Sequence, residues 1–344
     1  MKQLIRILIL SNLVFSVGVV NAEVTVYGRV IYNIVSDDTS DDIYFGRHEF
    51  AESTFGVKGS HAYEGVTFGA QIEIGLDEGV SNLLQNDSNA RNRIQELWVD
   101  SKYGKVKLGT GPGITWIISD VDQSGTWWSD PLGNSQRFGS TRRGPAGQSQ
   151  TPFVQSQSLF LERLIYESPE VLPGGKLYAQ LSEDSGYELA AKYVSNGWRV
   201  NAWTVDYGDG DNDEDPQANI DGNDGTLGFF GAERGRGVLA GYLHSSGVNF
   251  TATYGYASLF DDSERDFVNA KLGYTQGKHA FSVSVGDYGG EDATGTATAD
   301  HTRTTVAYHF IPVSGVRLWI QATEGDTDNE ENFNAIALGG LIKF

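Results

Sequence analysis

The feature of this 344-residue sequence that most constrains its fold is an alternation of apolar and polar residues with a period of two. In segment 249–257, Phe250, Ala252 and Tyr254 share one face of an extended chain, and polar residues or glycine lie between them. Segment 281–286 alternates in the same way. This period is typical of β-strands with one apolar face, and no long segment has a sustained helical stripe. The sequence therefore predicts an all-β protein.

Two kinds of connection separate the alternating runs. Short ones contain the glycine or asparagine that tight hairpins favour, and they lie at 103–105, 195–197, 245–247, 276–278 and 312–315. Longer polar connections lie at 36–42, 77–90, 208–235, 289–300 and 325–331. Because short and long connections alternate, an up-and-down meander would carry its tight turns at one end and its long loops at the other. Bacterial membrane β-barrels have this asymmetry.

These breaks divide the chain into about sixteen expected strands, an even number, as single-chain bacterial membrane barrels require. Their expected bounds are 24–35, 52–61, 65–76, 91–102, 105–110, 160–168, 175–183, 186–195, 197–207, 236–245, 248–259, 266–275, 278–288, 302–310, 315–324 and 332–344. The chain ends at Phe344 within such a run. A last strand of this kind could pair with the first and leave no open edge.

The faces opposite the apolar ones are polar enough to surround water. They carry Lys58, Gln71, Glu73, Lys192, Asn269, Lys271, Arg303 and Arg317. Aromatic residues near strand ends would form the interfacial girdles of a membrane barrel, and they are Tyr27, Tyr32, Tyr207, Tyr274, Tyr288 and Phe344. The sequence predicts a transmembrane antiparallel up-and-down β-barrel. The alternative is a secreted β-rich binding protein, whose two sheets would bury the same apolar faces against each other.

The N-terminus has the layout of a secretory signal peptide. Lys2 and Arg6 precede an apolar run at 7–20, and Val20-Asn21-Ala22 supplies small or apolar residues for cleavage. A single membrane anchor is the alternative, but the run is short for a span and no basic cluster follows it. We therefore expect a cleaved signal peptide at 1–22 and a barrel domain at 23–344.

Charge and composition exclude several classes of function. The chain has 45 acidic and 25 basic residues, a formal charge of −20 and no cysteine. This charge argues against nucleic acid as the main partner, and the lack of cysteine rules out thiolate metal sites and disulfides. We find no nucleophile elbow, zinc-protease motif or Walker loop, so we expect no enzymatic activity, cofactor or metal. Ser245 beside His244 is an adjacent pair from which an outer-membrane hydrolase could be built, but adjacency in a strand points the two side chains to opposite faces.

Four segments resemble the Gram-negative general diffusion porin family. They are Val24–Arg29, Ser53–Gly59, Leu97–Gly109 and Leu338–Phe344, and the resemblance covers essentially the whole mature chain. It implies a homotrimer of sixteen-stranded barrels in the bacterial outer membrane, each with a water-filled pore narrowed by the third long loop. The implied partners are outer-membrane lipid, lipopolysaccharide, and the small hydrophilic solutes and ions that diffuse through the pore. A channel of the same architecture that selects a sugar, phosphate or organic acid is the alternative function.

The connection between Thr110 and Phe160 is about fifty residues long, and loops of that size are usually functional or disordered. It is rich in large apolar side chains that would be costly to leave in water. These are Trp116, Ile117, Ile118, Trp127, Trp128, Leu132 and Phe138. We therefore expect this loop to pack inside its own barrel and to narrow the lumen.

The resemblance implies that acidic residues on this loop face basic residues on the wall across a constriction, where opposed charges act on passing solutes. The expected loop residues are Asp120, Asp122 and Asp130. The expected wall residues are Arg29, Lys58, Arg91, Arg93 and Lys107. Alternation near Ile94 does not separate the two faces of its strand cleanly. An alternative wall set is Arg137, Arg142, Arg143 and Arg163.

An acidic run at 206–224 falls in an expected external loop. Its Asp-x-Asp-x-Asp core faintly resembles a calcium loop but lacks the closing glutamate, so we interpret it as a solvated acidic loop. After removal of Lys2 and Arg6 the formal charge is 23 − 45 = −22. This charge favours cations at the mouth of a pore, whereas arginines near the constriction would offset it.

Overall fold

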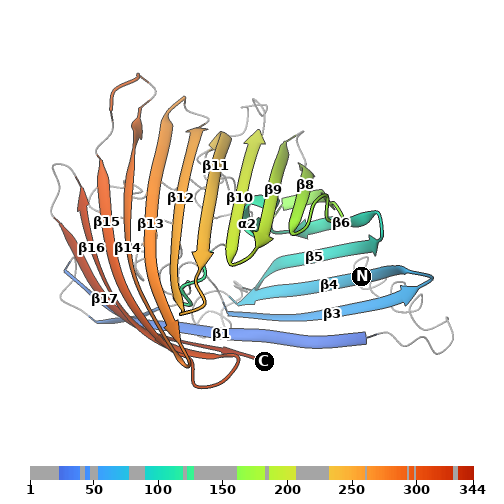
Figure 1. Ribbon diagram of the computed structural model, residues 1–344, viewed down its shortest axis with the longest axis horizontal. Helices are drawn as coiled ribbons and strands as arrows, with labels where there is room; N and C mark the ends of the chain where they lie inside the picture. The colour runs from blue at the N-terminus through green and yellow to red at the C-terminus, as the bar shows by residue number, and fades with distance from the viewer. Residues whose placement is uncertain are drawn as a thin grey trace.

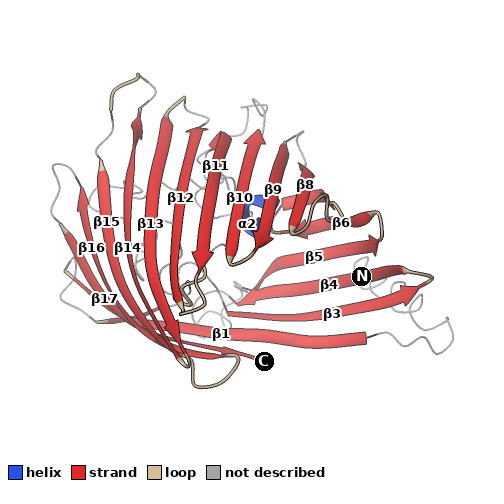
Figure 2. Ribbon diagram, viewed as in Figure 1, coloured by secondary structure: helices blue, strands red, loops and turns tan. Residues whose placement is uncertain are grey.

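The computed structural model describes residues 23–38, 43–46, 53–76, 90–118, 122–127, 161–182, 186–206, 232–259, 262–292, 294–297, 300–327 and 332–344. Within these ranges the chain forms one sheet of 17 strands and a short helix, α2 (Ile114–Ile118). Figure 2 shows the helix, in blue, beside the strands of the sheet. No helix in the described part of the chain is long and apolar enough to cross a membrane.

All the strands expected from the sequence are present. They are β1 (Glu23–Asp37), β3 (Ser53–Tyr63), β4 (Val66–Leu76), β5 (Ala90–Ser101), β6 (Gly104–Gly111), β7 (Leu161–Glu167), β8 (Gly175–Ser182), β9 (Tyr187–Ser195), β10 (Trp198–Asp206), β11 (Ala232–Leu243), β12 (Val248–Leu259), β13 (Glu264–Gln276), β14 (His279–Glu291), β15 (His301–Phe310), β16 (Val316–Thr327) and β17 (Phe333–Lys343). One strand was not expected, the three-residue β2 (Tyr44–Gly46).

The sheet closes into a barrel because β17 pairs with β1, from Arg29↔Lys343 to Asp37↔Ala335 (Figure 1). Every strand pair is antiparallel, and each strand from β4 to β16 pairs with both of its neighbours in the sequence. The short β2 pairs with β1 at Asn33–Val35, just beyond the pairing of β3 with β1. Because β2 and β3 pair with different parts of the same strand, β1, they occupy one place in the ring. The 17 strands therefore form a sixteen-stranded barrel. The predicted antiparallel up-and-down barrel is confirmed.

The two ends of the barrel differ as the connection lengths predicted. At one end, here the turn end, strands are joined by tight turns such as Glu64-Gly65 and Asn196-Gly197. The φ angles are 47° and 81° in the first turn and 51° and 83° in the second. Two successive positive φ angles are the backbone of a type I′ hairpin turn, which matches the twist of the strands. The long connections lie at the opposite end, here the loop end.

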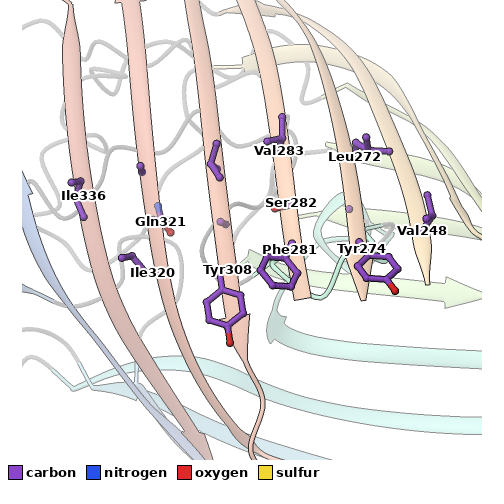
Figure 3. A pocket seen from close by; sticks show the side chains of 14 residues that line it. Val248, Leu272, Tyr274, Phe281, Ser282, Val283, Tyr308, Ile320, Gln321 and Ile336 are labelled. Atoms are coloured by element: carbon purple, nitrogen blue, oxygen red, sulfur yellow. The ribbon is translucent and has the colours of Figure 1, made fainter. Parts of the chain in front are cut away.

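The outside of the barrel is apolar and the inside is polar. Side chains exposed on the outer face of β12–β17 include Leu272, Tyr274, Phe281, Val283 and Ile320, and Figure 3 shows them along a shallow groove. Buried positions inside the ring instead include charged and amide side chains, such as those of Lys271, Glu188 and Gln180. In a β-sandwich the apolar side chains would instead fill a dry core between two sheets. An apolar outer face and a polar inner face suit a barrel that is surrounded by lipid and contains water.

Two of the aromatic residues expected in the outer girdles point inward instead. Tyr27 hydrogen-bonds Gln71 inside the barrel, and Tyr288 is 2% exposed and stacks against Phe267. Tyr27 covers Gly56, where a larger residue would collide with its ring. The ring of Tyr27 therefore occupies the space beside a glycine of the next strand, and strand-end position alone does not reveal this. Tyr32, Tyr274 and Phe344 are exposed, and Tyr207 lies outside the described residues.

Candidate functional site

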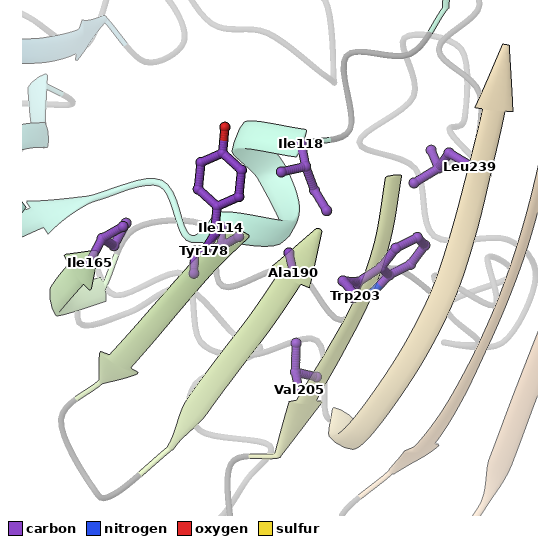
Figure 4. Packing of buried hydrophobic residues seen from close by; sticks show 8 residues of the cluster. All are labelled: Ile114, Ile118, Ile165, Tyr178, Ala190, Trp203, Val205 and Leu239. Atoms are coloured by element: carbon purple, nitrogen blue, oxygen red, sulfur yellow. The ribbon is translucent and has the colours of Figure 1, made fainter. Parts of the chain in front are cut away.

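The loop between β6 and β7, here called L3, begins with the helix α2, which packs against the inner wall (Figure 4). Ile114 and Ile118 are fully buried. They belong to a cluster with Ile165, Tyr178, Ala190, Trp203, Val205 and Leu239, which come from β7 to β11. Burial of two isoleucine side chains is worth several kcal/mol by area, roughly 1.5–3 kcal/mol each. The loop is therefore attached to the wall and does not extend into solvent at this point.

Wall side chains also satisfy the ends of this short helix, whose terminal backbone groups have no partners within it. The backbone N–H of Ile114 donates to Oε1 of Gln180 at 3.1 Å, and that of Thr115 donates to Oε2 of Glu188 at 2.9 Å. At the other end, Nδ2 of Asn201 donates to the carbonyl oxygen of Ile118. The helix exists because the wall supplies both of its caps.

Farther along L3, residues 122–127 are fixed to β13, β14 and β16. The Asp122 carboxylate accepts from the Lys271 ammonium at 2.8 Å, and these side chains are 1% and 0% exposed. Oγ1 of Thr126 lies 2.7 Å from Oγ of Ser282. Arg317 donates to the carbonyl oxygen of Gly125 at 2.6 Å. A buried ion pair thus stands at the centre of a set of hydrogen bonds that hold this segment.

The described parts of L3 follow the inner wall around much of the barrel. Contacts begin at β7 and reach β16, and Trp127 packs beside Ile31, Trp319 and Leu341 of β1, β16 and β17. The loop therefore folds into its own lumen, as predicted. The inner face of β3–β6 and of the turn-end part of β1 (residues 23–29), here called the open arc, lies across the lumen from this path. Residues 119–121 and 128–160 of L3 lie outside the described part.

Arg163 ties the start of L3 to the open arc. Its guanidinium donates to Oε2 of Glu96 at 2.8 Å, to the carbonyl oxygen of Pro112 at 3.0 Å and to that of Gly109 at 2.6 Å. Lys107 contacts the other carboxylate oxygen of Glu96 at 3.2 Å. The side chain of Arg163 is fully buried. A planar guanidinium suits this position because it donates in several directions at once.

The structure places the expected wall residues on the open arc. Arg29, Lys58, Arg93 and Lys107 lie on the inner faces of β1, β3, β5 and β6. Arg93 contacts Glu73 at 2.7 Å, and Lys107 contacts Glu96, so acidic residues of the same arc neutralise both. Nζ of Lys58 lies 5.7 Å from the centre of the Trp98 ring. Arg91 is in β5, but its side chain is not described.

Of the expected loop acids, Asp122 faces the wall behind L3 and not the lumen in front of it. Asp120 and Asp130 lie outside the described residues, as do Arg137, Arg142 and Arg143 from the alternative wall set. The alternation pattern assigned no loop-anchoring role to the residues that hold L3, which are Gln180, Glu188, Asn201, Lys271, Ser282 and Arg317. Each reads as one more polar residue of an inner face. Their contacts with L3 depend on closure of the barrel, which brings the loop next to strands far away in the sequence.

A β-bulge explains why alternation near Ile94 is irregular. The pairing of β4 with β5 passes from Glu73↔Ile94 to Ile74↔Asn92, which leaves Arg93 as an extra residue. Two residues of β5 therefore oppose Glu73, and the alternation of faces shifts by one at this point. Arg93 consequently reaches the inner face together with Glu96, although an odd number of positions separates them. The interrupted pattern in the sequence was the signal of this bulge.

Other candidate sites from the sequence have ordinary surroundings where they are described. His244 lies at the end of β11, with Nδ1 2.9 Å from Oγ of Ser246 in the following tight turn. Asp206 ends β10 and lies 3.6 Å from Arg234, whereas residues 207–224 of the acidic run are outside the described part. Among described residues, no group of three acidic or histidine side chains is placed to hold a metal ion.

Comparison with known families decides the classification. The family model for Gram-negative porins matches residues 10–340. This chain belongs to the Gram-negative porin family. The porin is therefore a multi-pass protein of the bacterial outer membrane, and it forms a diffusion channel; the secreted binding protein is not favoured. No curated protein sequence matches it significantly.

Solved structures share the fold of this porin at low sequence identity. The anion-selective porin from Comamonas acidovorans has a TM-score of 0.70 and 12% identity, covering 94% of this chain and 100% of that one. OmpT of Vibrio cholerae has a TM-score of 0.67 and 13% identity, covering 94% and 98%. OmpF of Salmonella typhi, in a complex with daunomycin, has a TM-score of 0.62 and 14% identity, covering 93% and 97%.

Proposed function

We propose that this porin is a general diffusion channel in which hydrophilic solutes and ions pass between L3 and the open arc. The observation that carries the proposal is the attachment of L3 to the wall opposite that arc. The buried pair Asp122–Lys271 and the capped helix α2 hold the loop aside, so the passage has one fixed boundary. The other boundary is the open arc, a hydrated face of mixed charge.

The charges of this passage form the second part of the proposal. Arg29, Lys58, Arg91, Arg93 and Lys107 supply the basic groups of the wall, and Asp120 and Asp130 supply the acidic groups of the loop. Asp122 serves to anchor L3. Because Glu73 and Glu96 pair with Arg93 and Lys107, the wall presents closely spaced charges of both signs, which suits passage of many small polar solutes.

Assembly, processing and chemistry also belong to the proposed function. The porin assembles as a homotrimer in contact with lipid and lipopolysaccharide, and a signal peptidase removes residues 1–22. It carries out no chemical step and needs no cofactor or metal. Mass spectrometry of the protein extracted from outer membranes tests the cleavage, since a chain beginning at Glu23 is expected. Crosslinking in the membrane tests the trimer.

Planar-bilayer recording of the purified protein tests the channel. We expect stepwise insertion of open pores, closures in groups of three, and a current that rises linearly with salt concentration. Millimolar sugars, phosphate or organic acids should leave this current unsaturated. A current blocked at low concentrations of one of these solutes would contradict a general pore and would favour the substrate-selective alternative.

A further inference from the structure

The outer face of the barrel changes from apolar to charged at one level near its loop end. On β11, Val238 is exposed and Leu239 is buried, so the even-numbered residues of this strand face outward. A run of outward apolar residues is followed by a charged one on β11, β13, β14 and β16. The first outward charges on these strands, here called the collar, are Arg236, Asp266, Asp287 and Glu324. Because charges are costly against hydrocarbon but not at its borders, the collar marks the level of the lipid headgroups.

The collar lies in the outer leaflet of the membrane, and its signs are segregated. The longer loops of bacterial membrane barrels face the outside of the cell, and the collar is next to them. Among the described side chains of β10–β16, the outward arginine and lysine residues are Arg234 and Arg236, both on β11, which lies between β10 and β12 (Figure 1). Strands β13, β14 and β16 carry outward acids instead. An anionic headgroup is therefore attracted to β11 and repelled along β13–β16.

The guanidinium of Arg236 is held in place without being neutralised. It forms no ion pair with any carboxylate of the described residues. Its Cζ lies 5.2 Å from the centre of the Tyr256 ring, which is directly opposite on β12. The Tyr256 hydroxyl donates a hydrogen bond to Glu264, and this bond fixes the ring. Since an aromatic face attracts a guanidinium without cancelling its charge, Arg236 keeps a positive charge for an anion of the headgroup layer.

Two further groups lie beside Arg236 on the same outer face. Arg234 is two residues away along β11, roughly 7 Å at the backbone, and it pairs with Ser258 of β12. Arg234 contacts Glu233 at 2.8 Å and Asp206 at 3.6 Å, yet 58% of its side chain is exposed. Guanidinium groups donate in the geometry that phosphate oxygens accept, and the Ser258 hydroxyl is one more donor. These three residues can therefore surround one phosphate.

We propose that Arg236, together with Arg234 and Ser258, binds the phosphate of an outer-leaflet lipid of the lipopolysaccharide type. The acyl chains of the same molecule lie against Val238 and Tyr254, which are paired, exposed and one step nearer the turn end. Free phosphate would gain only the charge contacts, so burial of the chains favours the lipid. The inference rests on the proposed function, in which the porin is in contact with lipopolysaccharide.

Native mass spectrometry of the purified porin in detergent micelles tests the site, because it resolves protein with and without a bound lipid. The probes are diphosphoryl lipid A, the same lipid after removal of its phosphates, and inorganic phosphate as a competitor. We expect diphosphoryl lipid A to reach half-saturation at a concentration about tenfold lower than the dephosphorylated lipid, since only the former has an anion for the arginines. Millimolar inorganic phosphate should leave the bound lipid in place.

Variants connect the preference to Arg236. Arg236→Gln should raise the half-saturating concentration of diphosphoryl lipid A about fivefold and leave that of the dephosphorylated lipid unchanged. Lys102→Gln is the matched control, because Lys102 is also exposed, with Nζ 4.9 Å from the centre of the Tyr103 ring, but lies in a tight turn at the opposite end of the barrel. It should have no effect. Tyr256→Leu should weaken binding about twofold, whereas Tyr256→Phe keeps the ring and should bind normally.

The outcomes separate this inference from the channel itself. Equal half-saturation by the two lipids, or equal behaviour of Arg236→Gln and Lys102→Gln, would overturn the phosphate site. Displacement of the lipid by millimolar inorganic phosphate would overturn the lipid as the occupant. Both results leave the channel intact if the unmodified porin conducts salt in planar bilayers. Absence of that conductance would instead overturn the proposed function. Salt conductance measured first for each variant shows that it has folded.

Discussion

At the residue scale, a buried ion pair holds L3 in place inside a water-filled barrel. Asp122 and Lys271 are withdrawn from water and contact each other at 2.8 Å. Removing one partner of a buried pair leaves an uncompensated charge, which costs far more than the net value of the pair. The position of the loop therefore depends on both residues being present.

The substitution Lys271→Met should destabilise the folded porin by about 3–5 kcal/mol, because it leaves the Asp122 carboxylate buried and unpaired. Guanidinium unfolding in detergent micelles measures the change. The double variant Asp122→Asn/Lys271→Met should recover part of the loss, since no buried charge remains. If the single and double variants are equally stable, the ion pair does not anchor the loop.

Arg163→Lys should loosen the start of L3 although it keeps the charge. A lysine ammonium cannot reach Glu96, Gly109 and Pro112 with the planar geometry of the guanidinium, and each hydrogen bond lost costs about 0.5–1.5 kcal/mol. We expect lower stability and more frequent brief closures in single-channel records. Arg236→Lys, on the exposed outer face of β11, is the matched control and should change neither quantity.

At the element scale, all the long strands could be predicted from the sequence because lipid outside and water inside impose a strict alternation on each of them. Bounds differ where that alternation stops. β11 begins four residues earlier than expected, at Ala232, because glycines and charged residues precede its apolar stretch. The three residues of β2 are too few to show a period.

The loop anchors could not be predicted for a different physical reason. Glu188 and Lys271 meet L3 through contacts 73 and 149 residues apart in the sequence, and these depend on closure of the ring. The inner-face positions of Arg29, Lys58, Arg93 and Lys107 lie on strands next to the first loops, and the role of these residues at a constriction stays a prediction. Their carboxylate partners were not anticipated, since pairing across strands depends on register.

The bulge in β5 leads to a prediction about deletions. Deleting Arg93 removes the extra residue, so Asn92 and Ile94 still oppose Ile74 and Glu73 and no face is exchanged. We expect a folded barrel whose pore favours cations more strongly, because Glu73 has lost its contact with Arg93. Heat-modifiable migration on gels reports folding, and the reversal potential in a salt gradient reports selectivity.

Deleting Val283 in the regular strand β14 is the control. On one side of the deletion every residue of β14 would move to the opposite face of the sheet, because the register of β14 with its two neighbours contains no bulge that could absorb the shift. We expect little or no folded protein. If both deletion variants fold equally well, or if the Arg93 deletion variant fails to fold, Arg93 is not an extra residue that β5 can lose without exchanging its faces.

At the scale of the whole molecule, the barrel depends on the seam between its first and last strands. Gly28 and Phe344 exchange backbone hydrogen bonds of 2.9 and 3.1 Å. A Cβ atom at Gly28 would lie 2.6 Å from the Phe344 ring and 2.7 Å from the carbonyl oxygen of Thr54. Gly28→Ala should therefore cost about 1–3 kcal/mol by overpacking and lower the yield of folded protein.

Gly340→Ala provides the matched control on the same seam. Its added Cβ would have its nearest neighbour, a Leu318 carbon, at 3.4 Å, which is an ordinary contact. Guanidinium unfolding of both variants in micelles gives the comparison. Equal stability of the two would show that closure does not depend on the space around Gly28.

The net charge of the chain predicts the ion preference of the whole channel. With a formal charge of 23 − 45 = −22 after removal of Lys2 and Arg6, and with Arg93 and Lys107 each beside a carboxylate, we expect a modest preference for cations. The reversal potential across a salt gradient decides the sign, and the preference should weaken at high salt through screening. A clear preference for anions would show that unpaired basic groups of the constriction dominate.

The path of L3 around the inner wall has a mechanical consequence. A barrel one strand thick can be squeezed toward an ellipse by the pressure of the surrounding bilayer. Here the attached loop lines the tube at β7–β11, β13, β14 and β16, and we expect it to stiffen that sector. We expect the aperture, and with it the flux, to stay constant when the membrane is thinned or stretched.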